Sequence, residues 1–172
     1  MLYKYLLAID PSGSFIEGKG TTGWCVFNCT ENKVTIAHSL KAKEHGKMEL
    51  YWDAHIQLIK DFQKRYGKDL IVIIEDYILY EHKMKDQINS RMETCKVIGI
   101  IQHYCYLQGL PYCMQLAATV KNRWTNDILG YKKYVFKKSR SYCLSDRKTI
   151  LDRHALDSIR HAVHFATFKN GG

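Results

Sequence analysis

Hydrophobic residues along the chain form short runs that predict five β-strands. Residues 5–9, 22–27 and 33–40 are rich in apolar side chains and are separated by turn-forming segments, which predicts three strands joined by hairpins. Residues 70–74 form a continuous, largely β-branched run, the pattern of a central strand that is covered on both faces. Residues 112–116 predict a fifth strand.

A second pattern, with apolar residues every three or four positions, predicts helices between these strands. It is present over residues 48–66, 87–107 and 152–168, and Asp152 is a candidate N-cap of the last helix. Residues 120–129 predict a shorter helix, whereas residues 130–146 have no clear period and are expected to be irregular. This order of elements predicts an α/β domain with a mixed sheet.

Length and composition limit the possible classes of protein. The chain has 172 residues, of which 46% are hydrophobic, so a single domain with a real core is expected. No apolar run approaches the roughly 20 residues that span a bilayer, and the first residues do not resemble a secretion signal, which predicts a cytoplasmic protein without a membrane segment. The six cysteines form no CxxC pair and are expected to be reduced thiols, so zinc binding is not expected.

Four residues at the predicted ends of elements are candidates for chemistry. Asp10 and Glu75 each end an apolar strand, and His154 and Asp157 are three residues apart, so they share one face of the last helix. Each has a structural alternative, such as a turn at Asp10 or a solvated strand end at Glu75. Together they would repel one another unless a cation lay between them, and such ligands suit Mg²⁺ or Mn²⁺.

The motifs around these residues resemble the RuvC family of Holliday junction resolvases, and most closely its small bacteriophage members. Residues 10–12 with 22–24 resemble the family's first motif, residues 73–76 the second, and residues 154–162 the last. The resemblance implies an RNase H-like nuclease domain over residues 1–172, with a five-stranded sheet, its first three strands antiparallel, and helices on both faces.

The resemblance also implies which residues hold metal. The family's catalytic and metal-binding positions fall on Asp10, Glu75, His154 and Asp157, with Asp76 and Asp152 as lower-ranked substitutes. Two Mg²⁺ ions about 3.5–4 Å apart would clamp the scissile phosphate, and Mn²⁺ could replace them.

The sequence departs from the family at two places. The segment from residue 13 to residue 20 is longer than in cellular members, and Lys19 within it is a candidate DNA contact. Ile78 stands where cellular members commonly have an aromatic wedge, although Tyr77 and Tyr80 are close by.

Positive charge is concentrated in residues 121–148, which we call the basic segment. The whole chain has a net charge of +9, a surplus that favours a polyanionic partner. The basic segment has nine basic and two acidic residues, interleaved with aromatic side chains, which is typical of a phosphate-binding surface. Its candidate DNA contacts are Lys121, Arg123, Lys132, Lys133, Lys137, Lys138, Arg140, Arg147 and Lys148.

These features predict a structure-selective endonuclease acting on four-way and other branched DNA. Paired nicks would require a homodimer, for which the helix at residues 87–107 is the candidate interface because Met92, Ile98, Ile101 and Tyr104 cover much of its circumference. Two alternatives stay open at this point. One is a ribonuclease H acting on RNA–DNA hybrids, and the other is a catalytically silent protein that binds branched DNA.

Overall fold

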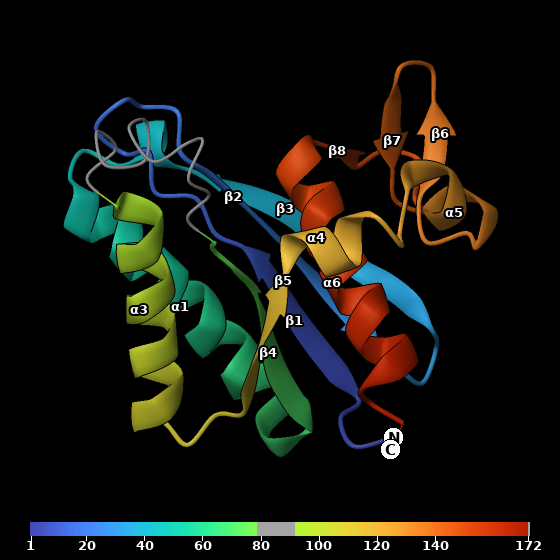
Figure 1. Cartoon of the computed structure of the whole chain (residues 1–172), viewed down its shortest axis with the longest axis horizontal. Coiled ribbons are helices and arrows are strands. Elements are labelled where there is room, and N and C mark those ends of the chain that lie inside the picture. Colours follow the sequence, from blue (N-terminus) through green and yellow to red (C-terminus); the bar gives the residue numbers. More distant parts are fainter. Residues whose placement is uncertain (79–91, 172) are drawn as a thin grey trace.

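A computed structural model describes residues 1–78 and 92–171, and its centre is a five-stranded sheet (Figure 1). The strand order is β3-β2-β1-β4-β5, with β1–β2 and β2–β3 antiparallel and with β1–β4 and β4–β5 parallel. The predicted mixed sheet with three antiparallel strands is therefore confirmed. The strands are β1 (Tyr5–Asp10), β2 (Thr21–Asn28), β3 (Lys33–Lys41), β4 (Leu70–Asp76) and β5 (Tyr112–Leu116).

Helices cover both faces of this sheet, as predicted (Figure 1). On one face, α1 (Met48–Tyr66) and α3 (Glu93–Leu107) pack on strand residues such as Leu7 and Ile74. On the other face, α6 (Arg153–Phe168) packs on Leu6 and Ile73. The central strands β1 and β4 are buried on both faces, which explains their continuous apolar sequences. Two short 3₁₀ segments, η1 (Ala42–Glu44) and η2 (Gly67–Asp69), flank α1.

The region after β5 differs from the prediction. The single helix expected over 120–129 is two short helices, α4 (Ala117–Lys121) and α5 (Asn126–Tyr131), because the Thr125 side chain caps a new helix by accepting a hydrogen bond from the Ile128 amide. Residues expected to be irregular form most of a small antiparallel sheet of β6 (Phe136–Lys138), β7 (Ser141–Cys143) and β8 (Ile150–Leu151). Strands of two or three residues are too short to produce a readable period.

Helix α3 begins at Glu93, and the first residues of the helix predicted over 87–107 lie outside the described residues. Ile98 and Ile101 are buried in the core, so they do not support the predicted dimer interface. The exposed apolar side chains on this helix are instead Tyr106 and Leu107, at its C-terminal end. In the described part of the chain, the helices are too short or too polar to cross a membrane.

Candidate active site

Asp10 ends β1 and is held there by a buried network of polar side chains. The residues after it turn away from the sheet, and the Ser12 amide donates to the Thr22 hydroxyl at 2.9 Å. The Tyr51 hydroxyl on α1 donates to the Ser12 carbonyl at 2.9 Å, and His55 Nε2 lies 2.8 Å from the Thr22 hydroxyl. This network ties the turn after Asp10 to both β2 and α1. It therefore restricts the backbone position from which the Asp10 side chain extends.

The first turn of α6 brings His154 to Asp10 through a close approach to β2. Gly23 pairs with Asp10 across the β1–β2 ladder, and a Cβ added at Gly23 would lie 2.0 Å from the backbone carbonyl carbon of His154. Glycine at this position therefore allows the helix to sit against the strand. As a result, His154 Nδ1 lies 2.8 Å from Asp10 Oδ2.

Glu75 is the last residue but one of β4 and is contacted from three elements. It pairs with Gln115 of β5 in the sheet register. Its Oε2 lies 2.8 Å from Nε2 of the fully buried His161 on α6, and the other ring nitrogen of His161 lies 2.9 Å from Gln115 Oε1. Its Oε1 accepts a hydrogen bond from Lys121 Nζ at 3.0 Å. The Glu75 carboxylate is thus oriented by a histidine and charge-balanced by a lysine.

Asp157 is buried on α6 and shares Lys121 with Glu75. Lys121 Nζ lies 2.9 Å from Asp157 Oδ2, while Asp157 Oδ1 accepts a hydrogen bond from Arg160. Arg160 is itself fixed by donating to the Trp124 carbonyl at 2.8 Å. Asp10, Glu75, His154 and Asp157, which we call the acidic cluster, therefore lie near one another at one end of the sheet.

The electrostatics of the acidic cluster follow from burial and from these cations. Burial raises the pKa of Asp10 to about 6, and the nearby Glu75 carboxylate acts in the same direction. Burial also disfavours the charged form of Glu75, but His161 and Lys121 outweigh it and lower its pKa to about 2. The hydrogen bond to Asp10 raises the pKa of His154. Burial opposes the charge on Lys121, yet Glu75, Asp10 and Asp157 together raise its pKa.

The two lower-ranked acidic residues have structural contacts of their own. Asp152 is the N-cap of α6 and accepts a hydrogen bond from the Ala155 amide at 2.9 Å. Asp76 accepts one from the Tyr77 amide, also at 2.9 Å. Of the residues considered for the wedge, Tyr77 packs against the core and Ile78 is exposed, while Tyr80 lies outside the described residues.

The donor set of the acidic cluster suits a hard divalent cation, because it offers three carboxylates from β1, β4 and α6 with an adjacent imidazole. Within residues 1–78 and 92–171, no three histidine, cysteine or acidic side chains are already grouped tightly enough to hold a metal ion. The Lys121 ammonium instead lies between Glu75 and Asp157. Glu75 and Asp157 thus share one cation already, and their oxygen atoms are of the type that Mg²⁺ prefers.

The basic segment lies beside the N-terminal end of α6, in α5 and the small sheet (Figure 1). Its lysine and arginine side chains are exposed except for Lys121, which is half-buried. Some are held by local contacts, since Arg123 stacks 4.0 Å from the centre of the Phe168 ring and Lys138 donates to the Arg147 carbonyl. Trp124, one of its interleaved aromatics, is a core residue, whereas Tyr131 is 87% exposed.

The long segment after Asp10 is anchored at the start of α3. The Gly13 amide donates to the Thr94 hydroxyl at 3.0 Å, and the Phe15 amide donates to the buried Glu93 carboxylate. Lys19, the predicted DNA contact in this segment, is exposed, and its ammonium forms an ion pair at 3.3 Å with Glu17, which is also exposed. Such a surface pair contributes little to stability, so Lys19 is accessible to a ligand.

Sequence reasoning missed several members of the site. It assigned Lys121 only to the DNA-binding surface, and it did not find His161, Gln115 or Arg160. One signal was present, because His161 lies four residues after Asp157 and so shares its helical face. The positions of Lys121 and Gln115 depend on how β5 and α4 run past β4, which no local pattern reports.

Two of the solved structures with a similar fold are nucleases. T. thermophilus RuvC, solved in complex with a Holliday junction substrate, has a TM-score of 0.66 at 13% sequence identity, over 98% of this chain and 98% of that chain. The large terminase nuclease of the thermophilic phage G20c has a TM-score of 0.51 at 11% identity, over 93% of this chain and 81% of that one. No protein-family model and no curated protein matches the sequence. The similarity confirms the predicted RNase H-like fold.

Proposed function

We propose that this protein is a metal-dependent endonuclease that resolves four-way and other branched DNA by paired nicks. The observation that carries the proposal is the convergence of Asp10, Glu75 and Asp157 from three separate elements onto one end of the sheet, with Lys121 between two of them. The similarity of the whole fold to a resolvase that was solved with a Holliday junction supports the choice of substrate.

Asp10, Glu75 and Asp157, with His154 beside them, are the residues that would hold Mg²⁺. When bound, the metal would activate a water molecule and neutralise charge on the scissile phosphate. Gln115 and His161 keep the Glu75 carboxylate in one orientation. The hydrogen bond between His154 and Asp10 places a proton carrier at the edge of the cluster, where the His154 ring remains partly accessible.

We assign two roles to Lys121, one in the free protein and one in the DNA complex. Without DNA its ammonium neutralises Glu75 and Asp157, which would otherwise repel each other. With DNA bound, its flexible and only half-buried side chain can turn from these carboxylates to a phosphate oxygen. A lysine in this position stabilises negative charge that develops at the phosphate during cleavage.

The exposed cations of the basic segment would hold the DNA backbone. Phosphate contacts position a protein on DNA without reading its sequence, which suits an enzyme that recognises a branch by shape. Two symmetric nicks need two such sites, so the prediction of a homodimer is part of this proposal.

A substrate panel tests the proposed function. Labelled four-way junction, linear duplex and RNA–DNA hybrid are incubated with the protein in Mg²⁺, in Mn²⁺ or in EDTA, and the products are resolved on denaturing gels. We expect paired nicks in the junction that require metal. Cleavage of the hybrid alone would favour the ribonuclease H alternative, cleavage that survives EDTA would contradict the metal mechanism, and metal-independent binding without any cleavage would identify a silent DNA-binding protein.

A further inference from the structure

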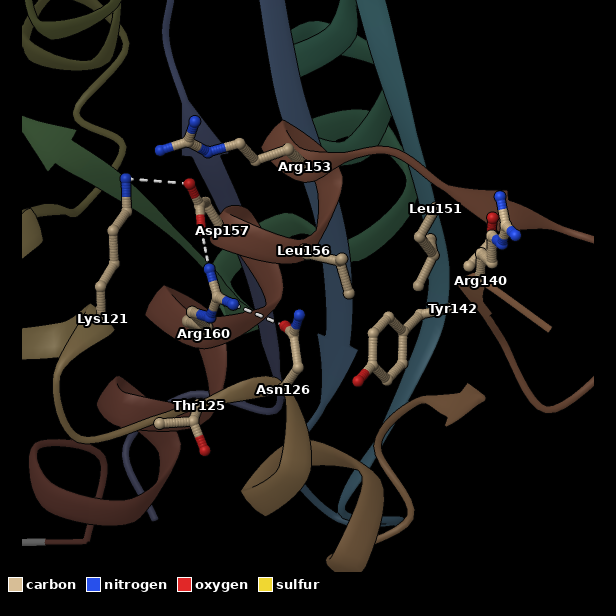
Figure 2. Close-up of a pocket in the computed structure, with 11 residues that line it drawn as sticks. Lys121, Thr125, Asn126, Arg140, Tyr142, Leu151, Arg153, Leu156, Asp157 and Arg160 are labelled. Atoms are coloured by element: carbon tan, nitrogen blue, oxygen red, sulfur yellow. Dashed lines mark hydrogen bonds and ion pairs between the residues drawn. The ribbon is translucent and has the colours of Figure 1, made fainter. Parts of the chain in front are cut away.

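A pocket of about 600 Å³ opens directly beside the acidic cluster (Figure 2). Asp157 and Lys121 form one side of it, while its other walls come from α5, β7, β8 and α6. Ligand pockets are typically several hundred Å³, so this space is large enough for one nucleotide but does not admit a base-paired duplex.

The walls of the pocket combine an apolar surface with cations. Leu151, Leu156 and Tyr142 lie together on one part of the wall in Figure 2, and the Tyr142 ring offers a face on which a planar group can stack. Arg140 and Arg153 lie on either side of the pocket in that view and have no ion pair with another described residue. This combination suits a nucleotide, with its base against the apolar wall and its phosphates near the arginines.

Asn126 presents a hydrogen-bond donor whose orientation is fixed. The Arg160 guanidinium can only donate, and one of its nitrogens donates to Asn126 Oδ1, so the Asn126 amide must keep its oxygen toward Arg160. Its NH₂ group, on the same carbon as that oxygen, therefore points toward Leu156 on the wall of the pocket (Figure 2). In the described part of the chain, that nitrogen has no hydrogen-bond acceptor.

We propose that this pocket takes the unpaired nucleotide next to the scissile phosphate, and that Asn126 makes cleavage selective for a base with a keto group. Guanine O6 and thymine O4 are acceptors that an amide NH₂ can recognise, whereas adenine and cytosine present an amino group at the corresponding position. Arg160 is a positioning residue, because it turns the Asn126 amide. This inference rests on the proposed function, since branched DNA supplies the unpaired nucleotide.

The test uses four junctions that differ only in the base next to the cut, and a fifth that lacks this base. Cleavage rates are measured in Mg²⁺, and equilibrium binding is measured in EDTA. We expect the wild-type protein to prefer guanine or thymine about five- to tenfold over adenine or cytosine, the size of one base-reading hydrogen bond, and to lose that advantage on the abasic junction.

Two variants of Asn126 separate base reading from folding. Asn126→Asp keeps the oxygen that Arg160 needs and replaces the donor with an acceptor, so the preference should move toward adenine and cytosine. Asn126→Ala should remove the preference. Lys132→Ala, which removes an exposed cation from the basic segment, should weaken binding equally for every base. Thermal melting shows which variants fold. If Asn126→Ala does not fold, the base preference of Asn126→Asp tests the inference by itself.

Two results would overturn the inference alone. One is an unchanged base preference in Asn126→Asp, and the other is an abasic junction that the wild-type protein binds and cuts as well as the preferred one. A wild-type protein that cuts none of the junctions in any metal contradicts the proposed function instead, and the binding series in EDTA still decides whether Asn126 distinguishes bases.

Discussion

In the acidic cluster every carboxylate contacts an internal histidine or cation, whereas in the basic segment most cations extend into solvent. The difference reflects the cost of burial. A buried charge without a partner is strongly destabilising, so Asp10 and Asp157 are each held by contacts within the fold. Exposed lysines remain solvated and need no partner. The two regions therefore depend on different ligands, a cation at the acidic cluster and phosphates at the basic segment.

Lys121 belongs to both regions, and this makes it the most informative residue for the comparison. It lies within the basic segment of the sequence, yet its ammonium contacts Glu75 and Asp157 at about the distance of a strong hydrogen bond. A substitution there should behave as a change in the acidic cluster.

We expect Lys121→Met to lower the cleavage rate about 100-fold or more, the effect of removing a charge stabiliser at a reacting phosphate. Junction binding should change little. The salt slope, which is the slope of the logarithm of the binding constant against the logarithm of the salt concentration, should become smaller in magnitude by less than about one unit. Rates come from single-turnover gels and affinities from fluorescence anisotropy in EDTA.

The matched control is Lys132→Met, which removes the same charge from the exposed part of the basic segment. It should leave the single-turnover rate at saturating protein near that of the wild type. If Lys121→Met instead weakened binding and cleavage in equal measure, Lys121 would be an ordinary phosphate ligand.

The buried network behind Asp10 predicts that stability falls in acid. Burial lowers the pKa of His55 to about 4, so its ring is neutral near pH 7. The carbonyl of Tyr51, 2.7 Å from Nδ1, can only accept, so Nδ1 carries the proton and Nε2 accepts from the Thr22 hydroxyl. A histidine near 6.5 in the unfolded chain then takes up a proton before the folded one. Stability should be complete above pH 6.5 and should decline as pH falls toward 4, by about 3 kcal/mol for His55 alone.

Urea denaturation of the wild type and of His55→Gln across this pH range measures the effect. The difference between their unfolding free energies should shrink as the pH falls, because only the wild type has this histidine to protonate. His103→Gln, an exposed substitution on α3, should keep the wild-type acid dependence. A constant difference between wild type and His55→Gln would contradict the neutral, buried state of His55.

The smallest effects are expected from single substitutions in the basic segment. Lys132→Gln, Lys133→Gln, Lys137→Gln or Lys138→Gln should each lower junction affinity by less than about fivefold, since each exposed cation binds at most one phosphate. All four together should reduce the salt slope by about one unit for each DNA phosphate that the protein no longer neutralises.

A control with the same change in net charge replaces lysines near the opposite end of the sheet, where β1 and β4 begin. It should leave the salt slope unchanged, and an equal reduction would mean that net charge, and not the basic segment, attracts the DNA. The control residues are Lys4, Lys60, Lys64 and Lys68.

The sequence predicts the parts of this molecule that local patterns encode. Burial on both faces makes β1 and β4 continuous apolar runs, so Asp10 and Glu75 could be placed at strand ends and in one site. The small sheet was missed because its strands are too short to show a period. Contacts such as Lys121 with Glu75 join residues 46 positions apart through the packing of β5 and α4, and no local pattern contains that information.

The central claim is that the acidic cluster cuts DNA and the basic segment holds it, and Asp10→Asn tests this most directly. Cleavage and binding of one labelled four-way junction are measured for the wild type, for Asp10→Asn and for Asp152→Asn, which keeps a good N-cap on α6. We predict that Asp10→Asn binds the junction like the wild type but does not cut it in Mg²⁺, while Asp152→Asn does both. Cleavage by Asp10→Asn at the wild-type rate would contradict the claim.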